Sequence, residues 1–508
     1  MKNLLLALLF NIFFAYSFSI FSQDGSIDNT FGNSGIVSTL IGTNTGAIEI
    51  QVDGKIVAVG SSYFGGSQLV FALTRYNING ILDYTFGNSG IVTTIIGNQN
   101  SYATSIEIQS DGKILAAGYC EVGGSLGVFA LTRYNINGSL DNTFGNGGIV
   151  TTPIGTNSGA YSIEIQSDGK ILAAGYCEIG GSLVFALTRY NINGSLDNTF
   201  GNGGIVTTSI GIASVANSIE IQVDGKIVVG GSINVGGSGF IALTRYNTNG
   251  SLDNTFGNSG IVSNPIGTNG DATSIEIQAD GKIVVGGSSS VSGFVVIALT
   301  RYNINGSLDN TFGNGGCVTT SIGTDSYASS IQIQADGKIV AAGSSGIGGS
   351  AVFALTRYNI NGSLDNTFGN GGIVTTPIGT NSWASSIQIQ ADGKIVAGGY
   401  CEDNGGHINL VRYNNSLAAD ISDYSNLTSQ ISICPNPFTI ATTLNTNKIF
   451  ENATFLVYNT LGEQVRKIDN ISGQTFTFYR ENLDEGIYFY QLNENNKILS
   501  EDKLIITD

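Results

Sequence analysis

The chain has 508 residues, of which 41% are apolar and only 12% are charged, well below the usual charged share of about 25%. Its net charge is −17, and its basic residues are spread along the chain without a cluster. A nucleic-acid-binding surface needs a concentrated basic patch. The composition therefore excludes a nucleic-acid partner and predicts weak affinity for anionic surfaces. We also expect no cofactor.

The start of the chain has the pattern of a secretory signal peptide. A charged segment precedes residues 4–14, which are nearly all apolar. We predict a signal peptide over residues 1–22, with cleavage after Ser22 or, alternatively, after Ser17. The apolar run is short for a stable span, so a retained anchor is the lesser alternative. We expect a mature protein without a membrane span.

One unit of about 56 residues recurs seven times. Such a period indicates supersecondary units that bury their apolar faces only against one another. Two markers define the period. The tripeptide Asp-Gly-Lys starts at Asp53, Asp111, Asp168, Asp224, Asp280, Asp336 and Asp392, and the string Thr-Phe-Gly places its ring at Phe31, Phe86, Phe144, Phe200, Phe256, Phe312 and Phe368.

Each repeat contains four short strand patterns. In the repeat at residues 329–377, Asp336 and Gly337 form a tight-turn signal between the first two patterns. Seven such antiparallel units predict an all-β fold, a seven-bladed β-propeller over residues 23–414. The predicted strands are Ser330–Gln334, Lys338–Gly343, Ala351–Tyr358 and Gly372–Thr376.

The two ends of the repeat array complement each other. Residues 27–37 resemble the tail of a repeat and precede any first strand. The array stops at residue 414 without a final Thr-Phe-Gly. We therefore predict that the N-terminal segment supplies the outer strand of the last blade, which closes the ring and covers both edges.

Three recurring strings carry a family resemblance. Asp-Gly-Lys-Ile, Ala-Leu-Thr-Arg-Tyr-Asn and Gly-Ser-Leu-Asp-Asn-Thr-Phe-Gly resemble the bacterial delta-60 repeat family and, more distantly, the NHL propeller repeat. The resemblance covers roughly residues 24–414. It implies a propeller fold and almost no chemistry.

One Arg and one Asp also recur in every repeat. A feature common to all blades predicts a structural role, here a bidentate Arg–carboxylate clamp that fixes a loop against a strand. A ring of ligand-binding arginines is the alternative. Representative members are Arg133, Asp141, Arg189, Asp197, Arg357 and Asp365.

Acidic residues recur on the innermost predicted strand. They predict a carboxylate ring that faces the central channel and either holds a cation or lies in channel water. Asn-rich loops such as residues 135–141 offer one carboxylate each, so we interpret them as turns and not as calcium loops. The ring positions are Glu49, Glu107, Glu164, Glu220, Glu276, Gln332 and Gln388.

The variable segments of the repeats are predicted to lie on one face of the propeller. Aromatic residues gather in them, which suits a sugar or peptide ligand; drift under relaxed constraint is the alternative. The last blade is the best candidate site. Its candidate ligand-binding residues are Trp383, Tyr400, Glu402, Asp403 and His407. A metal site from Cys401, Asp403 and His407 is weighed against an ordinary divergent loop.

Catalysis has little support in the sequence. Residues 123–127 match Gly-x-Ser-x-Gly, but no helix pattern follows. A single His leaves few nucleophile–base pairs, while a two-carboxylate hydrolase stays open. Five cysteines without a pattern common to all repeats indicate thiols and not a disulfide framework.

The repeats end before a second region. We predict a polar linker over residues 415–430 and a small β-sandwich over residues 431–508. The strings at residues 435–438, 458–462 and 486–492 resemble the type A C-terminal sorting domain of the type IX secretion system of Bacteroidota. Cys434 departs from the aromatic or aliphatic residue expected there. The resemblance implies outer-membrane translocation, removal of the domain, and surface attachment or release.

The sequence therefore favours an exported binding propeller for an extracellular glycan or protein, secreted or attached to the outer-membrane surface. The expected partner is the type IX secretion machinery, and a monomer is expected. Two alternatives stay open: a structural or adhesive surface component without a discrete site, and a polymer-degrading enzyme.

Overall fold

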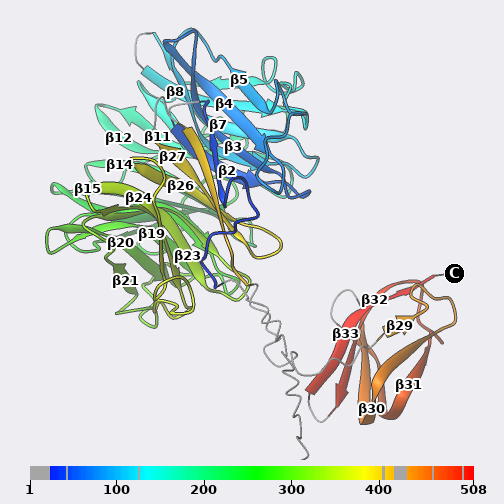
Figure 1. Cartoon of the computed structure of the whole chain (residues 1–508). Coiled ribbons are helices and arrows are strands. Elements are labelled where there is room, and N and C mark those ends of the chain that lie inside the picture. The colour runs from blue at the N-terminus through cyan, green and yellow to red at the C-terminus, as the bar shows by residue number, and fades with distance from the viewer. Residues whose placement is uncertain are drawn as a thin grey trace, which may run out of the picture. The chain divides into compact units, whose positions relative to one another are not determined.

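The computed structural model in Figure 1 describes residues 23–41, 44–123, 126–402, 407–416, 432–459, 463–494 and 497–507. All regular elements in these residues are strands, which confirms the all-β class. None of the described segments contains a helix long and apolar enough to span a membrane. The chain divides into two compact units, residues 1–418 and 419–508. The predicted signal peptide and most of the predicted linker lie outside the described residues.

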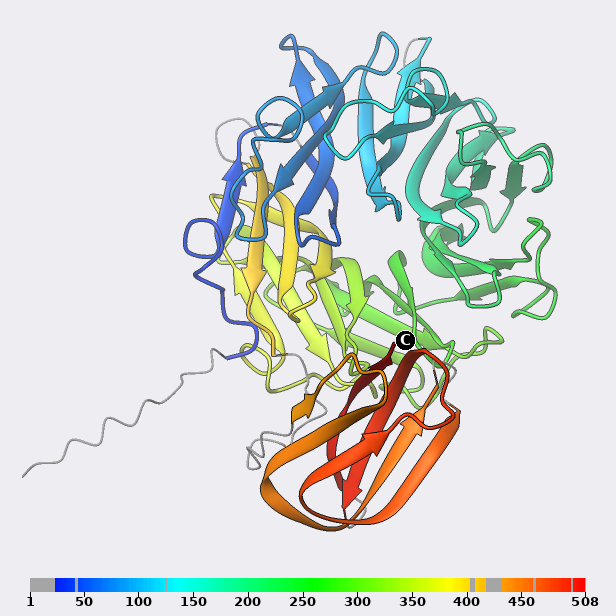
Figure 2. The same cartoon turned by 90° about the vertical axis from the view of Figure 1, so that its right-hand side faces the viewer.

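The first unit contains seven four-stranded antiparallel sheets, which confirms the predicted blades. In Figure 2 the blades follow one another round the ring from blue through green to yellow. The innermost strand of each blade contacts those of its two neighbours. These strands are β2 (Asn44–Ile50), β6 (Ser101–Ile108), β10 (Ser158–Ile165), β14 (Ala213–Ile221), β18 (Gly270–Ile277), β22 (Ser326–Ile333) and β26 (Ser382–Ile389).

The Asp-Gly-Lys turns lead into the second strands. Asp111 accepts a hydrogen bond from the backbone N–H of Lys113 at 3.1 Å. Gly112 has a φ of 80°, a backbone angle that residues with a Cβ avoid. The second strands are β3 (Ile56–Phe64), β7 (Ile114–Val122), β11 (Ile171–Ile179), β15 (Ile227–Val235), β19 (Ile283–Val291), β23 (Ile339–Ile347) and β27 (Ile395–Cys401).

The outer half of each blade consists of a long third strand and a four-residue fourth strand. Between them, the Asn137 side-chain oxygen accepts hydrogen bonds from the Ser139 backbone and hydroxyl, as predicted for an Asn-stabilised turn. The third strands are β4 (Gln68–Tyr76), β8 (Leu126–Tyr134), β12 (Ser182–Tyr190), β16 (Ser238–Tyr246), β20 (Phe294–Tyr302), β24 (Ser350–Tyr358) and β28 (His407–Tyr413). The fourth strands are β1 (Ile36–Thr39), β5 (Ile91–Thr94), β9 (Ile149–Thr152), β13 (Ile205–Thr208), β17 (Ile261–Asn264), β21 (Cys317–Thr320) and β25 (Ile373–Thr376).

The ring closes as predicted, because the N-terminal strand β1 pairs with β28 of the last blade. Figure 2 shows this blue strand beside the yellow strands. Two inner contacts also join the last blade to the first. Thr45 donates its hydroxyl to the Gly399 carbonyl at 2.7 Å, and Ser386 accepts from the Ile48 backbone N–H at 3.2 Å.

The apolar core lies between neighbouring blades. Phe129 and Leu131 of the second blade pack in one cluster with Ile163 and Ala173 of the third. The same arrangement recurs round the ring. Each blade therefore buries its apolar faces against its neighbours, as expected for a repeat fold.

The Arg–Asp pairs join blades as well as loops. Arg133 donates its Nε to Asp141 at 2.8 Å and a second nitrogen to Thr143 at 3.1 Å. Its third nitrogen donates to the backbone carbonyl of Ile192 in the next blade. Only one guanidinium nitrogen therefore contacts the carboxylate, and the predicted bidentate geometry is wrong. The remaining donors are needed for the hydroxyl and for the neighbouring blade.

The Nε contact with the carboxylate occurs at the other predicted pairs as well, although a second nitrogen of Arg357 donates to the side chains of Asp24 and Asn415 in place of a backbone carbonyl. Arg189 and Arg357 donate Nε to Asp197 and Asp365, both at 2.8 Å. A lysine from the Asp-Gly-Lys turn completes each site, as where Lys113 Nζ lies 3.2 Å from Asp141. We call the end of the propeller that carries these turns and the Arg–Asp pairs the clamp end.

The second unit is one hydrogen-bonded sheet of five strands. Its core packs around Phe455, whose ring centroid lies 5.4 Å from that of Phe478 and 5.1 Å from that of Tyr490. Bulges interrupt the pairing of its two longest strands. The strands are β29 (Ser432–Cys434), β30 (Ala441–Tyr458), β31 (Gln464–Tyr479), β32 (Gly486–Glu494) and β33 (Lys497–Ile506).

Candidate ligand-binding cavity

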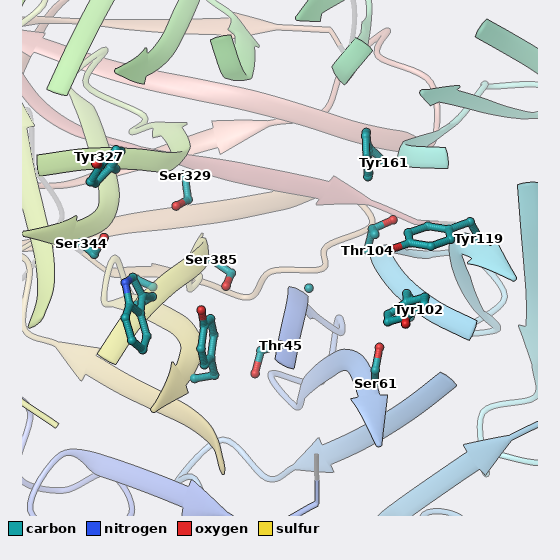
Figure 3. A pocket seen from close by; sticks show the side chains of 15 residues that line it. Thr45, Ser61, Tyr102, Thr104, Tyr119, Tyr161, Tyr327, Ser329, Ser344 and Ser385 are labelled. Atoms are coloured by element: carbon teal, nitrogen blue, oxygen red, sulfur yellow. The ribbon is translucent and has the colours of Figure 1, made fainter. Parts of the chain in front are cut away.

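A cavity of about 780 Å³ lies opposite the clamp end, where the innermost strands of five blades begin. Its volume falls within the range of about 300–1,000 Å³ that is usual for small-molecule sites. We call this end of the propeller the cavity end. The cavity is lined by Thr45, Gly46, Ser61, Tyr102, Ala103, Thr104, Tyr119, Tyr161, Tyr327, Ser329, Ser344, Trp383, Ala384, Ser385 and Tyr400 (Figure 3).

A β-bulge shapes every innermost strand beside the cavity. In β6 the register shifts between Ala103 and Ser105, so Thr104 is the extra residue. Its hydroxyl donates to the carbonyl of Ala160 in the next blade at 2.9 Å. Bulges redirect side chains at functional sites. Here the hydroxyl of the extra residue, Thr104, contacts the neighbouring blade. In the third blade the extra residue is Tyr161, which lines the cavity.

The first aromatic group of the cavity comes from the second and third blades. Tyr102 and Tyr119 stack with ring centroids 4.7 Å apart, and Tyr161 lies 5.6 Å from Tyr176. A Cβ atom at Gly159 would lie 3.0 Å from Tyr176 and 3.4 Å from Tyr119, so glycine allows the two rings to approach. Burial, reinforced by the neighbouring phenols, raises the pKa of Tyr119 to about 12.

The second aromatic group comes from the last two blades. Trp383 and Tyr400 are cross-strand partners, and their rings stack at 4.9 Å with an interplanar angle of 21°. Tyr327 adds a ring that is 45% exposed. Figure 3 shows Tyr327 on the side of the cavity opposite Tyr102 and Tyr161. Two aromatic walls therefore face each other across a hydroxyl-lined space.

The five candidate residues from the last blade have different positions. Trp383 and Tyr400 line the cavity. Glu402 accepts a hydrogen bond from the Asn381 side chain at 3.2 Å. His407 pairs with Cys401 in the sheet, on the face opposite Tyr400, and its Nδ1 lies 3.0 Å from the Ser38 hydroxyl. Asp403 lies outside the described residues.

Metal binding finds no geometric support in the described part of the chain, where no three His, Cys, Asp or Glu residues lie close enough to hold an ion. The sequence predicts aromatic residues on one face of the propeller in several blades, but it does not show which of them meet around one cavity. One sequence pattern does indicate the other blades that carry aromatic pairs. The string Tyr-Cys-Glu recurs at residues 119–121, 176–178 and 400–402, in the three blades that carry stacked or tilted aromatic pairs.

The ring of glutamates lies three residues beyond the bulge position of each innermost strand, as Glu107 lies beyond Thr104. This places it about 10 Å deeper in the channel. Gln332 donates to Glu276 and Gln388 donates to Glu49, both at 2.7 Å. Burial, followed by repulsion from other glutamates of the ring, raises the pKa of Glu276 to about 8. Burial also raises the pKa of Glu49 and of Glu164 to about 7. These carboxyls therefore carry protons near neutral pH.

Two family models match the chain. The repeats match the model described as "Domain of unknown function (DUF5122) beta-propeller" seven times. Residues 432–507 match the model described as "Secretion system C-terminal sorting domain". The seven matched segments are residues 51–86, 109–144, 166–200, 222–256, 278–312, 334–368 and 390–420.

Solved structures resemble the chain weakly. A copper-bound fungal alcohol oxidase of the AA5 family matches with a TM-score of 0.40 and 15% identity, over 94% of this chain and 100% of that one. The polysaccharide lyase Uly1 gives 0.41 and 14%, over 78% and 94%. Sqt1 from Chaetomium thermophilum gives 0.39 and 11%, over 75% and 100%. Likeness at this level carries no argument about function.

None of the curated proteins compared matches the chain. The two family models, in contrast, cover the seven blades and the C-terminal sheet. The repeats of this chain therefore belong to the DUF5122 beta-propeller family, and residues 432–507 belong to the secretion system C-terminal sorting domain family.

Proposed function

We propose that this protein is an exported propeller that binds an extracellular glycan in the cavity. The observation that carries the proposal is the pair of facing aromatic walls around Trp383 and Tyr119, with hydroxyl groups between them. Aromatic rings with one polar edge offer a flat apolar face to a sugar ring. Hydroxyl groups both donate and accept hydrogen bonds, as sugar hydroxyls do.

The C-terminal region carries the evidence for export. The sorting domain indicates secretion through the type IX system, so its machinery is a partner of this chain. We propose that residues 1–22 are a cleaved signal peptide and that residues 415–430 link the propeller, residues 23–414, to the sorting region at 431–508. Attachment to the outer-membrane surface or release into the medium then follows.

A glycan array with the full mature protein tests the proposal. We expect saturable binding that is lost in Trp383→Ala and kept in Trp383→Phe, because an aromatic face suffices for stacking. The matched control is Tyr84→Ala, since Tyr84 is 70% exposed and does not line the cavity. Equal loss in the control, or no saturable glycan binding at all, would contradict the proposal. The second outcome would favour a structural or adhesive component.

A further inference from the structure

Every lysine and arginine of the propeller belongs to the clamp end. Residues 23–416 contain fourteen lysines and arginines, one of each per repeat. Each lies beside an aspartate there, as where Arg245 donates to Asp253 at 2.8 Å and Lys226 Nζ lies 3.1 Å from the same carboxylate. The cavity end therefore has no lysine or arginine to neutralise an acidic group or to attract an anion.

Three glutamates lie beside the aromatic pairs of the cavity end. Glu121 and Glu402 follow the cavity-lining Tyr119 and Tyr400 by two residues, and Glu178 follows Tyr176, which packs against the cavity-lining Tyr161. Each glutamate therefore points to the same side of its strand as the tyrosine before it. The negative charges of these glutamates affect the pKa of the nearby tyrosines. Burial raises the pKa of Tyr400, and the negative charge of Glu402 raises it further.

The same asparagine position in the preceding loop holds each of these glutamates. The backbone N–H of Glu121 donates to the Asn100 carbonyl at 2.8 Å, and the Asn100 side chain donates to the Glu121 carboxylate at 3.1 Å. Glu402 has both contacts with Asn381, at 3.0 and 3.2 Å. The asparagine side chains therefore hold the carboxylates of Glu121 and Glu402 beside the rings. Of these two contacts, Glu178 has the backbone contact alone, from its N–H to the Asn157 carbonyl at 2.7 Å.

One further residue adds negative charge. Asp271 is exposed in the fifth blade, at the strand position that Trp383 occupies in the last blade. Aromatic faces with adjacent carboxylates and no lysine or arginine favour a cation and repel an anion.

We propose that the glycan bound in the cavity carries free amino groups, so that its protonated amines lie against the aromatic faces beside Glu121, Glu178 and Glu402. This inference rests on the proposed function and names the class of its ligand. An organic cation fits the site better than a metal ion, because the described residues offer no metal-ligand cluster. Aromatic faces bind ammonium groups through the ring quadrupole.

Calorimetric titration of the full mature protein tests the charge of the ligand. The probes are a β-1,4-linked glucosamine tetramer, its fully N-acetylated form and a glucuronic acid tetramer. We expect the amine form to bind at least about tenfold more tightly than the acetylated form. We expect no measurable binding of the glucuronic acid tetramer.

The other outcomes separate this inference from the proposed function. Equal or tighter binding of the acetylated or anionic tetramer would overturn the inference and leave glycan binding intact. Binding of none of the three, together with an empty glycan array, would remove the proposed function as well. Binding of tetralysine but not of the glucosamine tetramer would show that the cavity recognises an amine without a sugar, which overturns the inference.

A triple variant tests the three carboxylates. Glu121→Gln, Glu178→Gln and Glu402→Gln keep an oxygen that the asparagines can reach and remove three charges. We expect about tenfold weaker binding of the amine tetramer and unchanged affinity for the acetylated form, which also reports that the cavity is intact. The matched control, Asp53→Asn, Asp111→Asn and Asp168→Asn, removes three charges at the clamp end. Equal weakening by both sets would mean that only net charge matters and would overturn the inference.

Discussion

The two ends of the propeller are built from the same seven repeats but differ in how much their residues vary. At the clamp end every blade has the same Arg, Asp and Lys, and the distance from the Arg Nε to the carboxylate is 2.8 Å throughout. At the cavity end the position of Trp383 is held by Tyr, Gly, Val, Asp or Asn in other blades. Contacts between blades fix the residues of the clamp end, whereas those of the cavity end differ from blade to blade.

The carboxylates of the two ends also differ in their burial and in their partners. Each clamp aspartate is about 4% exposed and has two or more cationic partners. Glu121 and Glu402, beside the cavity, have amide partners and no lysine or arginine of the propeller near them. Charge at the clamp end is therefore paired within the fold, whereas these two carboxylates are not paired with a basic side chain.

The largest expected effect comes from opening the ring. Deletion of residues 23–41 removes β1, the buried Phe31 ring and Asp28, the partner of Arg412. We expect the free energy of unfolding to fall by more than about 5 kcal/mol, because an apolar face is exposed and a buried Arg loses its counter-charge. Urea unfolding measures this change. A truncated protein that unfolds like the parent would show that the segment does not close the ring.

A single clamp aspartate should have the next largest effect. Asp253→Ala leaves Arg245 buried without its carboxylate, which costs about 3–5 kcal/mol. Asp224→Ala removes the other, exposed partner of Lys226 and should cost less than about 1 kcal/mol. Thermal unfolding of the two variants compares a buried pair with a surface pair around one lysine. Similar losses would contradict the structural role assigned to the clamp.

The pH dependence of stability distinguishes the two kinds of carboxyl. Burial raises the pKa of clamp aspartates, but hydrogen bonds and charges, as from Thr367, Lys338 and Arg357, outweigh it and lower the pKa of Asp365 to about 2. A lowered folded pKa adds stability above the ordinary value of 3.8, which is lost as pH falls through the folded value. For the channel glutamates the sign is reversed. Their raised pKa adds stability below 4.5, which is lost as pH rises towards 8.

We therefore expect the free energy of unfolding to be greatest near pH 4–5 and to decline on both sides of this range. The variant Glu164→Gln, Glu220→Gln and Glu276→Gln should raise stability at pH 8 by about 1–3 kcal/mol, since one pKa unit corresponds to about 1.4 kcal/mol. Blades six and seven already carry Gln332 and Gln388 at this position. Chemical unfolding between pH 4 and 9 measures both slopes. An unchanged alkaline slope in the variant would exclude the glutamate ring as its cause.

The smallest effect on stability is expected at the cavity end. Gly159→Ala should displace Tyr176 and Tyr119 and weaken glycan binding severalfold, while changing stability by less than about 1 kcal/mol. In Gly118→Ala the new Cβ would lie 1.8 Å from the Tyr102 carbonyl, so this variant should be clearly destabilised. Melting curves and glycan titration of both variants provide the measurement. Similar melting temperatures for the two variants would contradict the packing described around Gly159 and Gly118.

The sequence predicted the features that recur. The seven blades, the closure by residues 27–37 and the pairing of Arg133 with Asp141 follow from period and spacing alone. The hydrogen-bond geometry of the Arg133 guanidinium does not follow from the sequence, because the sequence does not show that Ile192 of the next blade offers a carbonyl. The bulge at Thr104 was also missed, since one extra residue leaves the apolar alternation nearly unchanged.

The cavity could be predicted only in part. Trp383 and Tyr400 were recognised because the last blade is irregular. The sequence also places aromatic residues of other blades on this face. It does not show that they form the opposite wall, because which blades oppose one another across a ring depends on closure and curvature and not on local pattern. His407, close to Tyr400 in sequence, points to the other face of the blade because side chains alternate along a strand.

The most direct test of the account is a crystal structure of the mature protein soaked with the glucosamine tetramer. We expect this structure to show sugar rings against the Tyr102–Tyr119 and Trp383–Tyr400 pairs, with amines beside Glu121 and Glu402. A tetramer bound at the clamp end, or a cavity left empty while solution titration shows binding, would contradict it.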